Sequence, residues 1–135
     1  MEGDADRVRL LNQRFYDALS SQNLLRMEQI WSHSTYVRCV HPGWKMLSGW
    51  DSIRDSWRNI FTNAICLTVE PLTAQVEVHG AIAVVTCHER ISSFTLEGST
   101  VSKAQSTNIF EKSNGRWQLI LHHSSPVADP ASAKE

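Results

Sequence analysis

The sequence has no long hydrophobic run and no cluster of like charges. Its longest apolar stretch, residues 81–85, is far shorter than the ~20 residues that a membrane-spanning helix needs. Thirteen basic and fourteen acidic side chains are interspersed along the chain. The basic stripe that is typical of nucleic-acid-binding proteins is therefore missing. We expect neither a membrane nor a nucleic acid as a partner.

Cysteine is scarce, and its spacing does not suit a metal or disulfide framework. Cys39, Cys66 and Cys87 are widely separated, and no two of them form a CxxC pair. Each lies in a largely apolar stretch, where a free cysteine behaves as a small buried hydrophobic residue. The first nine residues, MEGDADRVR, carry acidic groups and no apolar core, unlike a secretory signal. These features predict free thiols and a reducing, cytoplasmic location.

The chain has the size and balance of one globular domain, with 135 residues, 41% hydrophobic and 20% charged. Apolar residues recur every three or four positions in three segments, which predicts helices at 5–20, 24–31 and 50–61. Asp4 and Asn23 precede the first two segments and are expected to be their N-caps. Gly49 precedes the third.

A change of hydrophobic period separates the two halves of the chain. Residues 35–41, between the second and third helices, are rich in β-branched and aromatic side chains and predict a strand. Beyond the third helix the period becomes that of a strand, which predicts four strands at 65–78, 81–94, 101–111 and 116–123. Helices on one side of such a meander give an α+β fold. The domain is expected over 4–126, followed by a flexible tail over 127–135.

Several short sequence motifs occur in a characteristic order. They are VHPGW at 40–44, GWD at 49–51, SW at 56–57, TNIF at 107–110, GRW at 115–117 and HHSSP at 122–126. In this order and spacing they closely resemble the SnoaL-like group of the nuclear transport factor 2-like superfamily, over roughly residues 5–126. The GxW and HxS motifs near the end of the sequence also resemble motifs of the association domain of calcium/calmodulin-dependent kinase II.

The resemblance implies a cone-shaped, strongly bent antiparallel sheet with three N-terminal helices on its concave side and one pocket. Superfamily members include isomerases, cyclases and hydrolases, and also non-catalytic binding and assembly domains. The resemblance therefore implies either a pocket for a small organic molecule or a protein-interaction module. Because helices cover only one face of the sheet, we expect a homodimer through the other face. Parallel strands, or a helix within 101–123, are not expected.

His41 is the candidate catalytic residue. It precedes Pro42, at a position that resembles the one held by the proton-transferring aspartate of isomerase relatives. Imidazole titrates near neutrality and can act as a general base. The alternative is a structural role, in which His41 stabilises the Pro–Gly turn through a hydrogen bond to a backbone carbonyl. The oxyanion-stabilising tyrosine of those relatives aligns with Phe15, and Tyr16 is one residue, about 100°, out of phase. This departure argues against steroid-isomerase chemistry.

The position of His88 depends on which face of its strand is inside. Alternation places His88 on one face of strand 81–94 and Glu89 on the other. His88 aligns with a basic pocket residue of the kinase association domain, so we expect it in the pocket. The alternative is a cross-strand pair, with Glu89 or Arg90 neutralising a neighbour.

His122 and His123 point to opposite faces, so at most one lines the pocket unless a bulge intervenes. Ser124 aligns with another basic pocket residue of the association domain. This favours His122 and Ser124 inside, with Trp117 and Leu121 on the opposite face; His123 stays the alternative.

Three more residues complete the predicted pocket. Asn108 is disfavoured inside a strand and needs a local partner. Trp44, beside the Pro–Gly turn, is expected at the mouth, and Trp57 comes from the third helix. The predicted ligand has an aromatic or apolar body and a polar or anionic tip. No cofactor is expected, and neither a His-x-His pair nor an in-phase carboxylate supports a metal site.

Overall fold

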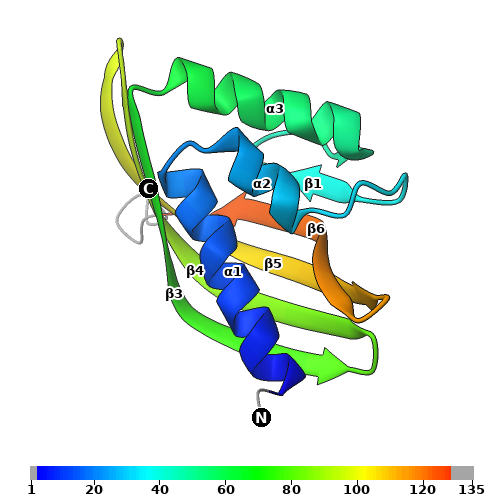
Figure 1. Ribbon diagram of the computed structural model, residues 1–135. Coiled ribbons are helices and arrows are strands. Elements are labelled where there is room, and N and C mark those ends of the chain that lie inside the picture. The colour runs from blue at the N-terminus through cyan, green and yellow to red at the C-terminus, as the bar shows by residue number, and fades with distance from the viewer. Residues whose placement is uncertain (1–2, 129–135) are drawn as a thin grey trace.

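The structure is a computed structural model that describes residues 3–128. Over this range it consists of three helices, α1 (Asp4–Ser20), α2 (Leu24–Ile30) and α3 (Trp50–Asn63), and one six-stranded sheet. The strands are β1 (Arg38–Val40), β2 (Leu47–Ser48), β3 (Cys66–His79), β4 (Ile82–Thr95), β5 (Gly98–Ser113) and β6 (Arg116–Pro126). The sheet is open and strongly curved, and the helices lie on one side of it (Figure 1). The expected α+β fold class is confirmed.

The sheet is mixed and has the strand order β2–β1–β6–β5–β4–β3. Strands β3 to β6 form the predicted antiparallel meander, and β6 lies inside the sheet between β1 and β5. β1, however, pairs in parallel with β6, so the expectation of a wholly antiparallel sheet was wrong at this pair. The chain between β1 and β6 passes through α3 and the rest of the sheet. No hairpin therefore forces these two strands to run in opposite directions.

The helix ends are close to the predicted ones, with one difference in capping. Asn23 caps α2 as predicted, because its side-chain oxygen accepts a hydrogen bond from the Arg26 backbone N–H at 3.0 Å. The N-cap of α1 is Gly3, whereas Asp4 is the first helical residue. The Asp4 carboxylate instead accepts a hydrogen bond from Trp117 Nε1 at 3.0 Å. This bond ties the first turn of α1 to the start of β6.

The inner face of α1 carries both apolar and polar groups to the sheet. The predicted stripe is buried, since Val8, Phe15 and Leu19 are at most 5% exposed. Asn12 and Tyr16, one turn apart, are equally buried at 3% and 1%. A helix that packs across β3 and β4 covers these two polar side chains from water, so their partners must come from the protein.

A bulge in β6 decides which residues of that strand face the helices. The register with β5 shifts by one residue, and Ile120 is the extra residue. Trp117 and Leu119 are buried before the bulge, and His122 and Ser124 are buried after it. Because an extra residue reverses the alternation, all four share the inner face. The expectation that Trp117 lies opposite His122 was wrong for this reason.

Three remaining expectations concern cysteine, the membrane and the tail. Cys39 and Cys87 are buried free thiols, whereas Cys66 is exposed at the start of β3, where it points away from the core. Between residues 3 and 128, no helix is long and apolar enough to cross a membrane. From residue 129 onward, the tail predicted over 127–135 lies outside the residues that the structure describes.

Candidate functional site

A cavity of about 260 Å³ lies on the concave side of the sheet. Most of its wall is apolar and includes Leu19, Trp57, Ile60, Leu67, Val69 and Ile91. Its polar lining consists of His41, Glu89 and His122, together with Ser93 and Ser102. We call His41, Glu89 and His122 the polar end of the cavity. They come from the end of β1, from β4 and from β6, which the sheet topology brings onto one face.

His41 is a buried, neutral imidazole. Its Nε2 lies 2.8 Å from Ser56 Oγ, and the Ser56 hydroxyl donates to the Ile53 carbonyl at 2.6 Å. Ser56 therefore accepts a hydrogen bond from Nε2–H, and Nδ1 of His41 carries the lone pair. Burial, and secondarily the nearby His122, lower the pKa of His41 to about 3. The Trp57 ring packs edge-on against the imidazole, with centroids 4.5 Å apart.

His122 is held by a fixed amide. Its Nδ1 lies 2.6 Å from Asn108 Oδ1. The Asn108 amide nitrogen donates to Asn12 Oδ1 at 2.8 Å and to the Tyr16 hydroxyl at 3.2 Å, which fixes the orientation of the amide. Nδ1 of His122 must therefore carry the proton, and Nε2 carries the lone pair. Burial, with a smaller contribution from His123, lowers the pKa of His122 to about 3.

Asn108 supports the site from behind and does not line the cavity. It is 0% exposed, and all its named partners are buried side chains. The expectation that something local satisfies this amide is confirmed. The partners Asn12 and Tyr16 come from α1, so the amide also links the helix to the sheet.

Glu89 is a buried carboxylate at the polar end, 2% exposed. Its Oε2 accepts a hydrogen bond from the Tyr16 hydroxyl at 2.6 Å, and Oε1 accepts one from the Ser124 hydroxyl. Tyr16 also lies 2.8 Å from Ser106 Oγ. Burial, followed by the charge of Glu89, raises the pKa of Tyr16 well above its usual value. Tyr16 therefore stays a neutral donor. Ser124 donates a hydrogen bond to Glu89 but does not itself line the cavity.

Glu89 was not predicted as a site residue, and His88 does not lie in the cavity where it was expected. His88 is exposed on the outer face of the sheet, where its Nδ1 lies 3.0 Å from Thr73 Oγ1. The structure does not bring His88 and His41 together, because alternation along β4 sends Glu89 inward and His88 outward. Both faces of the strand carry apolar residues, Ala83 and Val85 beside Glu89 and Ile82 and Val84 beside His88, so this part of the pattern did not decide between them.

His123 also lies on the outer face. It is exposed and, with His88, borders a separate hollow of about 630 Å³ on that side. Of the two adjacent histidines, His122 is therefore the one that faces the cavity. The two remaining predicted residues, Trp44 and Trp57, both line the cavity, and Trp44 is 46% exposed, as a residue at the mouth would be.

Trp57 lines the cavity, but its indole N–H is buried within the protein. Trp57 is 2% exposed, and its Nε1 has no hydrogen-bond partner within residues 3–128. A buried donor without an acceptor costs about 1–3 kcal/mol. Within the same range, no three or more His, Cys, Asp or Glu side chains are grouped as metal ligands would be. The site therefore offers two neutral imidazoles and one carboxylate on an apolar wall.

Comparison with known proteins agrees with this architecture. A family model described as a SnoaL-like domain matches residues 8–130. A solved structure from Streptomyces avermitilis, named as a candidate dehydratase of the NTF2-like family, is 30% identical. It superposes with a TM-score of 0.85 over 93% of this chain and 97% of that chain.

Two further relatives are assigned to other kinds of protein. A candidate calcium/calmodulin-dependent protein kinase type II association domain from Thiobacillus denitrificans is 23% identical, with a TM-score of 0.74. The match covers 89% of this chain and 94% of that chain. F-box protein SKIP8 of Arabidopsis thaliana is 28% identical over 115 residues, which are 85% of this chain and 47% of that protein. The chain thus spans about half the length of this relative.

Proposed function

Because the chain belongs to the SnoaL-like domain family, we propose that its concave cavity binds a small organic molecule with an apolar body and an uncharged polar end. The polar end of the cavity is the observation that carries this proposal. Glu89 supplies a carboxylate there, and the lowered pKa values of His41 and His122 leave both imidazoles neutral. An anionic tip would meet an uncompensated negative charge in a buried site. The sequence predicts a ligand with a polar or anionic tip; we now propose that this tip is polar and uncharged.

A hydroxyl or carbonyl group suits this end of the cavity. A hydroxyl can donate to the Glu89 carboxylate or to an imidazole lone pair, and a carbonyl oxygen can accept from the hydroxyls of Ser93 and Ser102, which also line the cavity. The apolar wall accommodates a ring or a short chain. With a volume of about 260 Å³, the cavity favours a ligand of one or two rings.

The same arrangement is suited to proton transfer. His41 Nδ1 carries a lone pair that can take a proton, as the sequence predicts for a general base, but the lowered pKa of about 3 makes it a weak one, and the Cys39 thiol lies 4.0 Å away. Burial disfavours the imidazolium, so His41 suits a step in which the proton is returned at once to the ligand. Isomerases and dehydratases need a base of this kind beside a carbonyl or hydroxyl group. The S. avermitilis relative, named as a candidate dehydratase, supports this class of reaction.

Replacement of Trp57 by phenylalanine tests ligand binding without removing the aromatic wall. We expect W57F to bind uncharged cyclic ketones about tenfold more weakly than the wild type by isothermal titration, since the smaller phenylalanine ring leaves part of the apolar wall without contact to the ligand. The matched control is W50F, because Trp50 is buried but does not line the cavity. Equal affinities of W57F and the wild type for every ketone that binds would contradict the proposed role of Trp57 in the cavity wall.

Assembly through the outer face of the sheet is a second candidate function. Val84, Ile109 and Leu121 are adjacent on β4, β5 and β6 and form an apolar row on the face that the helices leave uncovered. Each of the three is half-buried within the single chain. The resemblance to kinase association domains supports a role in self-association.

Charge placed in this row should separate the protomers. We expect the wild type to be a homodimer at micromolar concentration in light scattering and I109R to be a monomer, because a buried guanidinium cannot be solvated at the interface. S99R, at the exposed end of β5, is the control and should stay dimeric. A monomeric wild type under these conditions would exclude this assembly.

A further inference from the structure

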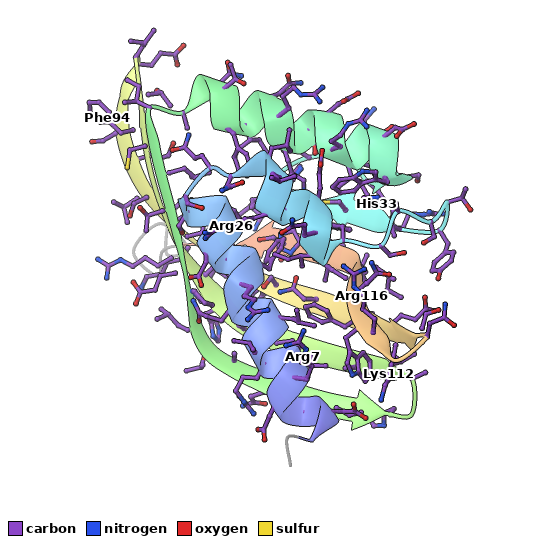
Figure 2. All side chains as sticks on the ribbon, in the orientation of Figure 1. Arg7, Arg26, His33, Phe94, Lys112 and Arg116 are labelled. Carbon is purple, nitrogen blue, oxygen red and sulfur yellow. The ribbon has the colours of Figure 1, made fainter. Side chains whose placement is uncertain are left out.

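A second hollow, of about 640 Å³, lies on the helical side of the molecule and is lined by four arginines. Arg7 and Arg14 come from α1, Arg26 from α2 and Arg116 from the start of β6. We call this hollow the arginine groove. Figure 2 shows Arg7, Arg26 and Arg116 on the side of the molecule that carries α1 and α2.

The positive charge of the groove is concentrated and not neutralised by its own residues. The whole chain has a net charge of -1, yet four of its nine arginines line this one hollow. Asp17 is the single carboxylate in the lining, and its Oδ1 accepts a hydrogen bond from Gln13 at 3.1 Å. Among residues 3–128, every ion pair involves Arg54, Arg58 or Lys112, so none involves a groove arginine.

The groove has the form of two charged sides above an apolar floor. Arg7 and Arg14 are two helical turns apart on the same side of α1, which separates them by about 10 Å. The floor consists of Leu11, Ile30 and Trp117, which are 8%, 7% and 4% exposed.

One groove arginine is also held in place by the protein. Nη2 of Arg116 donates to the Gln29 carbonyl at 3.3 Å, which restrains its guanidinium beside the end of α2. A guanidinium that is already restrained loses less side-chain entropy when a ligand binds.

We propose that the arginine groove binds an acidic, partly extended peptide segment of another protein. Guanidinium forks bind carboxylates with two parallel hydrogen bonds, and the apolar floor accepts a hydrophobic side chain between them. Residues three apart in an extended peptide are about 10 Å apart, the separation of Arg7 and Arg14. Nucleic acid fits less well, because it requires a continuous basic surface, and this sequence contains none.

Paired charge reversals test the proposal in the full chain. The probe is a fluorescent peptide with glutamate at every third position and leucine between, and its binding is measured by anisotropy at low and physiological salt. We expect R14E/R26E to weaken binding at least tenfold. The matched control is R9E/R58E, which makes the same change in net charge at two exposed arginines outside the groove. It should bind within about twofold of the wild type, because Arg9 is about 200° around α1 from Arg7.

Circular dichroism melts of both double variants show whether each is folded, and L11A gives a second, uncharged test of the groove floor. Three results would overturn the proposal. One is equal weakening by the two double variants, which indicates attraction to net charge alone. Another is the absence of peptide binding by the folded wild type at low salt. The third is tighter binding of a single-stranded oligonucleotide of equal charge, which would assign the groove to nucleic acid.

Discussion

The free energy of unfolding is expected to fall steeply as the pH is lowered from 7 to 4, by about 3 kcal/mol for each of the two buried histidines. The pKa values of His41 and His122 are lowered from 6.5 to about 3 in the folded protein. Below pH 6.5 the imidazoles of His41 and His122 become protonated in the unfolded chain. In the folded chain they become protonated only near pH 3. Stability is therefore unaffected by these groups above pH 6.5 and is lost progressively between pH 6.5 and pH 3.

Urea unfolding at several pH values measures this contribution. H122Q removes the titrating ring and keeps a side-chain donor for Asn108. The difference in unfolding free energy between the wild type and H122Q should shift by about 1.4 kcal/mol for each pH unit between 6 and 4. H79Q, at the exposed end of β3, is the control and should show no such shift. A difference between wild type and H122Q that is constant with pH would mean that His122 is not held neutral.

Replacement of Asn108 by leucine is expected to destabilise the fold by about 3 kcal/mol at pH 7, because it leaves several buried polar groups without partners. Asn12 Oδ1 loses its donor at 2.8 Å, and His122 Nδ1–H loses its acceptor at 2.6 Å. Leucine has the branching of asparagine and leaves no cavity, but its methyl groups cannot approach their neighbours as closely as 2.6–2.8 Å, so overpacking adds to the loss.

A double variant separates the lost hydrogen bonds from a general effect of the substitution. In N12L/N108L both members of the shortest α1–β5 amide contact are apolar, so part of the stability should return relative to the sum of the two single variants. N59L, on the exposed side of α3, is the control and should change stability by less than about 0.5 kcal/mol. Strict additivity in the double variant would argue against a direct amide–amide interaction.

Most of the architecture follows from periodicity and turn residues. The three helices and the four long strands are each at or near their predicted positions, because their apolar patterns match one period only. The parallel pairing of β1 with β6 was not predictable from local pattern. Its three residues, Arg38–Val40, are placed by the packing of α3 and the final strand.

The site was predicted less completely, for reasons that individual residues make clear. Alternation separates His88 from Glu89 correctly but does not say which face is inside, and the resemblance to association domains favoured the wrong one. The position of the bulge at Ile120 was not identified from the hydrophobic pattern of β6, so the faces of Trp117 and His122 were assigned inconsistently. Tyr16 was discounted for lying one position from the expected tyrosine, yet its hydroxyl reaches Glu89 because the whole inner side of α1 is covered by the sheet.

We propose that Glu89 and two neutral histidines select an uncharged ligand tip in the concave cavity. The most direct test is titration calorimetry at pH 7 with matched pairs of aromatic alcohols and carboxylates that share one ring system, such as 2-naphthol and 2-naphthoate. The wild type should bind the alcohol of each pair at least tenfold more tightly, and E89Q should bring the two affinities close together, because it removes the repelling charge. Tighter binding of the carboxylates by the wild type, or no binding of either member of any pair, would contradict the claim.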